Sequence, residues 1–280
     1  MIIDSHVHVG KGSVWGDFPV EYLLSIISES VDIAICSNLE GIDSNEFKNE
    51  YDSNLSMLEI ATKNSKLKPL LVCQPNLTEN SDVIRKLLLE HPEVIGLKFH
   101  PESMKLPADS SKYDAYLRLA QEFKLPCLYH SGHIKSRFSS PELIYKKAQE
   151  FPDVPIVLGH LSTGPRESHL RAINIVLESI EKQNSLLFVD TSWLDFAYEK
   201  LDETYQETIA LIRALKNSPR GDYTHRILWA SDCPVGAFNH EKHSYEHNLN
   251  IFKTRVMEEF NDKQLLENLL YKNALKLYDL

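Results

Sequence analysis

Two histidines lie two residues apart near the N-terminus, within the apolar run Ile2–Val9. Side chains alternate between the two faces of a strand, so His6 and His8 are expected to point the same way. Imidazole is the commonest protein ligand of divalent transition metals. The pair is therefore half of a candidate metal site, although two ordinary strand histidines would show the same spacing. Further ligands at the ends of other strands would decide between these interpretations.

Histidine or aspartate also ends three later apolar runs, at His130, His160 and Asp232. Any one of these side chains could simply cap its strand through local hydrogen bonds. Four runs that each end in a metal-ligating side chain are harder to explain in that way. The pattern predicts one metal site built from the ends of several strands. Asp4, two residues before His6, is expected to face the same side as the histidines.

A lysine and a further histidine lie in the apolar run Val94–His100. The alternate apolar residues of this run should face helices, which leaves Lys98 and His100 pointing inward. An ammonium group inside such a strand is costly unless it is paired or chemically modified. Both residues are therefore candidates for the same site.

The strands that would position these side chains recur along the whole chain. Each apolar run is followed by a stretch with helical spacing of apolar residues, such as Pro19–Ser30 and Asp109–Phe123. The expected strands are Ile2–Val9, Asp32–Ser37, Lys68–Gln74, Val94–His100, Leu125–His130, Val154–His160, Leu186–Thr191 and Arg226–Asp232. Strand–helix alternation of this kind predicts parallel strands joined by crossover helices.

Eight such units in 280 residues are what a closed (β/α)8 barrel, the TIM barrel, requires. No linker or composition shift divides the chain, so one α/β domain over residues 1–280 is expected. The alternative, an open doubly wound sheet, usually carries G-x-G-x-x-G after its first strand, and the segment Gly10–Gly16 does not match that pattern. In TIM barrels the chemistry lies at the carboxyl ends of the strands, where the candidate residues fall.

The composition restricts the class of protein. Hydrophobic residues at 42% and charged residues at 25% are ordinary for a globular protein. The formal net charge of -10 disfavours nucleic acid and anionic membranes as partners. No apolar stretch is long enough to span a membrane, and Ile2 directly follows Met1, which leaves no room for a signal peptide's leader. We therefore expect a cytoplasmic protein whose four cysteines are buried free thiols.

The ordered set His6-Val7-His8, His130, His160 and Asp232 resembles the amidohydrolase superfamily. The chain is most similar to the amidohydrolase-related branch of small metal-dependent hydrolases and decarboxylases. The segment 268–278 also resembles the C-terminal helix of that branch. The resemblance spans the whole chain, and it implies a divalent metal held at the barrel mouth.

The resemblance also implies a role for each residue. Three histidines and one aspartate would bind the ion, namely His6, His8, His130 and Asp232. Such an ion can activate a water molecule near neutral pH. Asp232 would both contact the metal and move the proton, and His160 would orient water or the oxyanion. Zinc is the expected ion, and a site of this kind also accepts manganese, iron, cobalt or nickel.

Lys98 departs from much of this branch. Other members of the superfamily carry a carbamylated lysine in the matching strand, where it bridges two metals, and His130 and His160 would then share the second ion. Two further roles stay open for Lys98: an ammonium that contacts an anionic substrate or Asp232, and a structural lysine whose ammonium reaches solvent. We predict one metal, with Lys98 and His100 close to the substrate.

Two loop residues complete the predicted substrate site. Arg166 follows the sixth strand and could clamp a substrate carboxylate with its planar guanidinium. It could equally begin a helix and face solvent. Trp193 follows the seventh strand and could line the substrate pocket or pack against a helix.

The predicted function is a metal-dependent hydrolase that acts on a small ester, lactone or amide through a metal-activated water. The alternative is a lyase, a metal-dependent non-oxidative decarboxylase of a small unsaturated or aromatic carboxylic acid. A barrel that binds a ligand without turnover is a third interpretation, which the complete ligand set disfavours. The expected partner is a small-molecule substrate, and a homodimer is the commonest arrangement for such enzymes.

Overall fold

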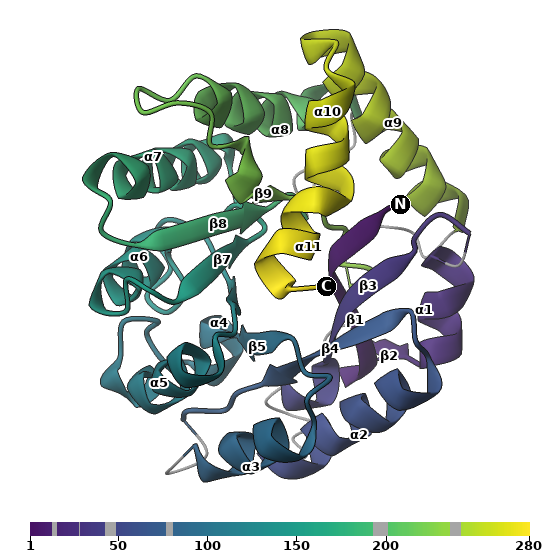
Figure 1. The fold of residues 1–280 in the computed structure, drawn as a ribbon, viewed down its shortest axis with the longest axis vertical. Helices are drawn as coiled ribbons and strands as arrows, with labels where there is room; N and C mark the ends of the chain where they lie inside the picture. The colour runs from purple at the N-terminus through teal and green to yellow at the C-terminus, as the bar shows by residue number, and fades with distance from the viewer. Residues whose placement is uncertain (13–15, 28, 43–48, 77–80, 193–200, 236–241) are drawn as a thin grey trace.

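The structure is a computed structural model of the chain. It describes residues 1–12, 16–27, 29–42, 49–76, 81–192, 201–235 and 242–280, without the side chains of 201–205 and 242–244. Within these residues strands and helices alternate along the chain, as the apolar runs predict. The protein has an α/β fold built on a curled, mostly parallel sheet (Figure 1).

The sheet has nine strands in the described part of the chain. They are β1 (Ile3–Gly12), β2 (Gly16–Phe18), β3 (Ile33–Asn38), β4 (Leu67–Val72), β5 (Gly96–Phe99), β6 (Cys127–His130), β7 (Pro155–Gly159), β8 (Leu186–Asp190) and β9 (Ile227–Leu228). Their order is β2-β1-β3-β4-β5-β6-β7-β8-β9, and β2 alone among them pairs antiparallel. Each predicted strand overlaps one of the parallel strands, whereas the apolar runs do not predict β2.

Most of the helices surround the sheet on its outer side, and α11 (Asn273–Tyr278) lies across the end of the space inside it (Figure 1). The other helices are α1 (Val20–Ile27), α2 (Glu50–Lys63), α3 (Asp82–Glu90), α4 (Pro101–Met104), α5 (Asp114–Phe123), α6 (Pro141–Glu150), α7 (Arg166–Lys182), α8 (Leu201–Lys216), α9 (Lys242–Phe260) and α10 (Lys263–Glu267). The main hydrophobic core lies between the sheet and these helices, and it includes Leu97 and Phe99. These two residues therefore face the helices, as the alternation in their strand predicts.

Backbone hydrogen bonds join β1 to the segment that follows β9. The N–H of Asp232 donates to the carbonyl of His6 at 2.8 Å, and the N–H of His8 donates to the carbonyl of Cys233 at 2.8 Å. Val7 and Cys233 also form a parallel bridge. The segment that carries Asp232 is thereby fixed beside the strand that carries His6 and His8.

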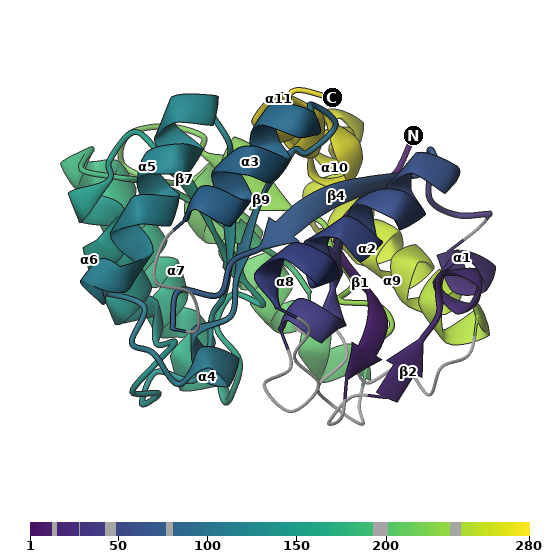
Figure 2. The same ribbon diagram turned by 90° about the horizontal axis from the view of Figure 1, so that it is seen from below.

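One end of the space inside the sheet is apolar. Side chains from six strands pack there against α11, and the cluster consists of Ile3, Ile35, Leu70, Leu128, Val157, Leu228, Ala274 and Tyr278. Helix α11 and both termini lie at this end, and α4 and β2 lie at the opposite end (Figure 2). The apolar cluster therefore closes the end away from the carboxyl ends of the strands.

Strand β1 changes face partway along its length. Asp4 pairs with Ala34 and Val7 pairs with Cys36, so two residues of β1 stand opposite one residue of β3 between these pairs. Such a bulge breaks the strict alternation of side chains. As a result Ile3, before the bulge, points into the apolar cluster inside the sheet.

The bulge overturns the prediction that Asp4 shares a face with His6 and His8. The carboxylate of Asp4 instead accepts hydrogen bonds from the Tyr245 hydroxyl of α9 at 2.7 Å and from the Ser231 hydroxyl at 2.5 Å. The prediction assumed that side chains alternate strictly along the strand. One extra residue in the strand reverses the face to which the residues before it point. Asp4 thus ties β1 to the segment before Asp232 rather than facing the site.

The described residues contain no helix that is both long and apolar enough to cross a lipid bilayer. The cysteines Cys36, Cys73, Cys127 and Cys233 are buried and free, as predicted. Burial raises the pKa of each thiol, so none of them offers a thiolate at neutral pH.

Candidate metal centre

Three of the predicted ligands converge where β1 meets the segment after β9. His6 Nε2 and His8 Nε2 lie 3.3 and 3.0 Å from Asp232 Oδ1. All three side chains are buried, and their donor atoms lie close enough together to hold one metal ion. Two imidazoles and a carboxylate suit zinc and the neighbouring transition metals.

Asp190, at the end of β8, fixes the ring of His6. Its Oδ2 accepts a hydrogen bond from His6 Nδ1 at 2.9 Å, which leaves the lone pair of the neutral ring on Nε2. Burial alone would raise the pKa of Asp190, but the contact with His6 lowers it to about 2 and keeps the acceptor ionised. Asp190 is absent from the sequence-based prediction, although it lies next to the end of the run Leu186–Thr191, much as other runs end in histidine.

A chain of hydrogen bonds continues from Asp190 to His130. The Ser192 hydroxyl donates to Asp190 Oδ1 at 2.5 Å and accepts from His160 Nδ1 at 2.8 Å. His160 Nε2 is therefore an acceptor, and His130 Nδ1 donates to it at 3.1 Å. This order of donors directs the lone pair of His130 to Nε2, the atom that would bind a metal. The fourth predicted ligand is thus oriented by His160.

The backbone at His160 is left-handed over three residues. The φ angles of His160, Leu161 and Ser162 are 65°, 46° and 77°, a region that residues other than glycine disfavour. Hydrogen bonds hold the turn: the N–H of His160 donates to Asp190 Oδ1 at 2.8 Å, and the Ser162 hydroxyl donates to the Gly132 carbonyl at 2.5 Å. Burial lowers the pKa of His160 to about 4, so its ring is neutral at pH 7.

Asp232 is an ionised carboxylate in a left-handed backbone position, with φ 61°. Burial would raise its pKa, and the nearby His160 and His6 hold the pKa well below the usual range of an aspartate. A buried anion of this kind can bind a cation and can accept a proton.

Lys98 points inward from β5, as the sequence predicts. Its Nζ lies 2.6 Å from His6 Nε2, and the residue is 1% exposed. The ammonium does not reach solvent, so the interpretation as a solvent-reaching structural lysine is wrong. Burial lowers the pKa of Lys98 to about 8, although Asp232 and Asp190 act in the opposite direction. Contact with substrate and carbamylation both stay predictions.

His100 also points inward, at the start of α4. Its ring stacks on that of His130, with centroids 4.0 Å apart and planes 13° apart. Its Nδ1 accepts a hydrogen bond from the N–H of Ser103 at 3.1 Å. Burial lowers the pKa of His100 well below its ordinary value, so the ring is neutral. Contact of His100 with substrate stays a prediction. The ring of His100 packs on that of His130, which is a candidate metal ligand.

The described residues contain a second group that could hold an ion, formed by His6, His160 and Asp190. Both oxygens of Asp190 already accept hydrogen bonds, Oδ2 from His6 and Oδ1 from Ser192 and the His160 N–H. A metal in this second group would have to replace several of these bonds. A metal between His6, His8 and Asp232 would replace the contacts of His6 Nε2 with Lys98 and of His8 Nε2 with Asp232, but it would leave the hydrogen bonds of Asp190 intact. The group that contains Asp232 is therefore the better candidate.

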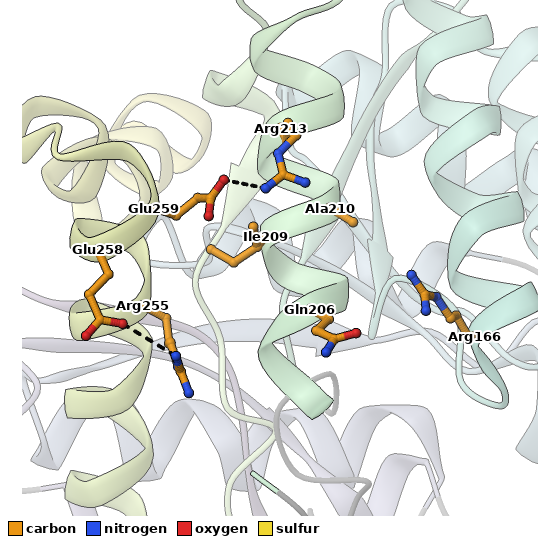
Figure 3. A pocket seen from close by; sticks show the side chains of 8 residues that line it. All are labelled: Arg166, Gln206, Ile209, Ala210, Arg213, Arg255, Glu258 and Glu259. Atoms are coloured by element: carbon orange, nitrogen blue, oxygen red, sulfur yellow. Dashed lines mark hydrogen bonds and ion pairs between the residues drawn. The ribbon is translucent and has the colours of Figure 1, made fainter. Parts of the chain in front are cut away.

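Arg166 lies apart from this cluster, at the first residue of α7. Its Nε lies 3.1 Å from Oε1 of Glu207. It lines a surface pocket together with residues of α8 and α9, among them Arg213 and Arg255 (Figure 3). The described lining of that pocket includes no candidate metal ligand, and the substrate clamp stays a prediction. Trp193 lies outside the described residues.

Fold and site together define an α/β protein with a candidate metal centre at the carboxyl ends of its strands. A family model described as Amidohydrolase matches residues 3–280. The chain therefore belongs to the amidohydrolase family, which confirms the resemblance seen in its ordered histidines and aspartate. No curated protein matches the chain in sequence.

Solved structures share this fold over their whole length. An amidohydrolase from Burkholderia multivorans with bound zinc has a TM-score of 0.66 and 12% identity, over 100% of this chain and 99% of that chain. A 5-carboxyvanillate decarboxylase from Sphingomonas paucimobilis has a TM-score of 0.63 and 12% identity, over 100% and 99%. A 2,6-dihydroxybenzoate decarboxylase from Rhizobium has a TM-score of 0.68 and 12% identity, over 99% and 98%. At such identities the likeness shows the fold alone.

Proposed function

We propose that this protein is a metal-dependent hydrolase of a small ester, lactone or amide. The observation that carries the proposal is the convergence of His6 Nε2 and His8 Nε2 on Asp232 Oδ1 in a buried site. Membership of the amidohydrolase family supports it. We further propose one (β/α)8 barrel domain with this site at its mouth, supported by the hydrogen bonds between β1 and the segment after β9.

The donor set fits a divalent ion, and we propose zinc. His6, His8, His130 and Asp232 would hold it, because hydrogen bonds at Nδ1 direct the Nε2 lone pairs of His6 and His130. The zinc in the Burkholderia multivorans relative supports this choice of ion. When bound, such an ion is a Lewis acid that makes a water molecule more acidic and polarises a carbonyl group.

The protein's own residues would handle the protons and the developing charge. Asp232, ionised at neutral pH, would accept a proton from the attacking water and return it to the leaving group. The buried ammonium of Lys98 would stabilise negative charge on the substrate oxygen. His160, neutral at this pH, would keep the ring of His130 in place.

A second candidate function is non-oxidative decarboxylation of a small carboxylic acid. The observation that favours it is Lys98, whose buried positive charge beside His6 would attract a substrate carboxylate. Two relatives of the same fold are decarboxylases of aromatic acids, which supports the candidate. The same metal ligands would serve either reaction.

One experiment separates the two reactions. The zinc-loaded chain is given a panel of esters and lactones in a pH-stat, amides in an assay for released amine, and 2,6-dihydroxybenzoate and 5-carboxyvanillate in a CO2 assay. Release of acid or amine that disappears in Asp232→Asn, without CO2, is the result we expect. Release of CO2 would assign the protein to the second candidate. A loaded protein that is inactive in both assays would contradict both functions.

We also propose that the enzyme acts in the cytoplasm on a small molecule, as a homodimer. The four free cysteines suit a reducing compartment. The acidic charge disfavours nucleic acid as a substrate. Sedimentation at micromolar concentration would test the oligomeric state, and a monomer there would contradict the dimer.

A further inference from the structure

A pocket of about 410 Å³ adjoins the candidate metal centre at His130. Its other lining residues come from α4 and from the segments after β6 and β7, and include Glu102, His133, Lys135, Ser136 and Thr163. A volume of this order suits a small organic molecule. Because His130, the fourth predicted metal ligand, also lines this pocket, a molecule bound at the metal could extend directly into it.

Hydrogen bonds fix the wall of the pocket around Glu102. Its Oε2 accepts from the hydroxyls of Ser136 and Ser139, each at 2.6 Å. The N–H of Gly132 donates to the carbonyl of Ser139 at 2.8 Å, which closes the segment on itself. A wall held in this way loses little conformational freedom when a ligand binds.

His133 is held in one orientation and one tautomer. The N–H of Lys135 donates to His133 Nδ1 at 2.8 Å, so the proton of the neutral ring lies on Nε2. Gly164, at φ 115°, allows the ring to lie close: a Cβ on that residue would be 2.7 Å from His133 Cδ2. His133 thus lines the pocket with a fixed ring whose N–H lies on Nε2.

The charges of the lining point to an uncharged ligand group. Glu102 brings one negative charge and Lys135 one positive charge, so the pair sums to zero. The Thr163 hydroxyl adds a further polar group to the same lining. A fixed N–H donor in a wall without net charge suits an oxygen atom that accepts a hydrogen bond.

We infer that this pocket binds the part of the substrate remote from the reacting bond, and that His133 donates from Nε2 to a neutral hydroxyl or carbonyl oxygen there. This inference rests on the proposed function, which places the reacting bond at the metal centre. His133 and Thr163 would then determine substrate specificity, and Gly164 would position the ring of His133.

The test measures binding rather than turnover, by calorimetry on the zinc-loaded full chain. The probes are plain carboxylates from propanoate to hexanoate, their terminal hydroxy counterparts, and dicarboxylates of the same lengths. We expect one hydroxy acid to bind about tenfold tighter than its plain counterpart, the size of one good hydrogen bond. His133→Phe keeps a ring of similar shape and should lose that preference, while the affinity for the plain acid stays.

Two further variants sharpen the test. Gly164→Ala displaces the ring of His133 and should lose the same preference, whereas His91→Phe, far along the chain on the C-terminal end of α3, should keep it. The inference would be overturned if the preference for the hydroxy acid survived in His133→Phe, if the wild-type protein lacked this preference, or if no probe bound. If a dicarboxylate bound tightest and lost this affinity in His133→Phe, the group bound by His133 would be a carboxylate and not a neutral oxygen. A protein with the preference that hydrolyses no ester would contradict the proposed function and leave this inference supported.

Discussion

The two ends of the space inside the sheet differ in chemistry although the same strands build both. At the end covered by α11 the described cluster is apolar and includes Leu128 and Val157. Along the same strands, two residues further, stand His130 and Gly159, beside buried histidines, aspartates and a lysine. Strand β6 therefore contributes Leu128 to the apolar cluster and His130 to the site.

The two ends also differ in their contribution to the free energy of folding. Apolar surface buried at the α11 end stabilises the fold by about 25 cal/mol for each Å² removed from water. At the other end, buried ionisable groups cost free energy unless they are paired, and Asp232 and His160 also hold strained left-handed backbone. We expect changes at the polar end to act on metal binding and activity, and changes at the apolar end to act on stability.

The largest effect is expected for Asp232→Asn. The substitution removes the anion on which His6 and His8 converge and the group that would move the proton. Hydrolysis should fall by about 10²–10⁴-fold, the usual contribution of a general acid or base. Steady-state kinetics with the best ester of the panel checks this, with exposed Asp153→Asn as the matched control. If Asp232→Asn kept wild-type activity, the polar end would have no part in the hydrolysis.

Leu128→Ala probes the apolar end. Leu128 is fully buried between the strands and α11. Its truncation should lower the free energy of unfolding by about 2–5 kcal/mol, as for other buried leucines. Denaturant unfolding measures this, with exposed Leu89→Ala as the control. If the affinity for zinc also fell tenfold in the folded variant, the apolar end would affect metal binding as well as stability.

Glu50 is a buried carboxyl whose partners among the described residues are Gln74 and Tyr116 rather than histidines, in contrast to Asp190. Burial raises its pKa from 4.5 to about 7, although the N–H of Gln74 and the Tyr116 hydroxyl both donate to it. The folded state therefore holds this proton more tightly than the unfolded chain. The stability from this group is fully present below its unfolded pKa and is lost as pH rises through about 7.

The variant Glu50→Gln cannot ionise, so it should not lose this stability. At pH 8 it should be more stable than the wild type by up to about 3 kcal/mol, and the difference should shrink toward pH 4.5. Unfolding curves across this range, with exposed Glu90→Gln beside them, make the measurement. A difference that stays constant with pH would show that Glu50 does not titrate there.

Asp190→Asn should have the smallest effect of the four variants, because it acts on the metal through His6. Loss of the charged acceptor for His6 Nδ1 should weaken zinc binding by about 10–100-fold, as for other residues that orient metal ligands. Competition with a chelator of known affinity measures this. An unchanged affinity would mean that Asp190 serves the fold alone.

Much of this architecture was predictable from local sequence. Apolar runs of strand length predicted each parallel strand, and the residues at their ends identified His130, His160 and Asp232 as neighbours. These features are local, since alternation and strand length need no knowledge of the partners. The face that Lys98 occupies followed from the same rule.

What could not be predicted depends on contacts between distant segments. The bulge that turns Asp4 away from His6 is set by the register between β1 and β3, which no pattern within β1 reveals. The orientation of the His133 ring depends on contacts with Lys135 and Gly164 in a folded loop. The ion pair of Arg166 with Glu207 of α8 likewise joins distant segments, and its role as a substrate clamp stays a prediction.

The central claim is that the polar end holds a metal, and elemental analysis tests it most directly. The full chain is reconstituted with zinc and bicarbonate, dialysed, and compared with a variant that carries His6→Ala and His8→Ala. The account predicts one zinc per wild-type chain and none in the variant, and two would support a carbamylated Lys98 that bridges them. A wild-type chain that stays empty in excess zinc, manganese, iron, cobalt or nickel would contradict the account.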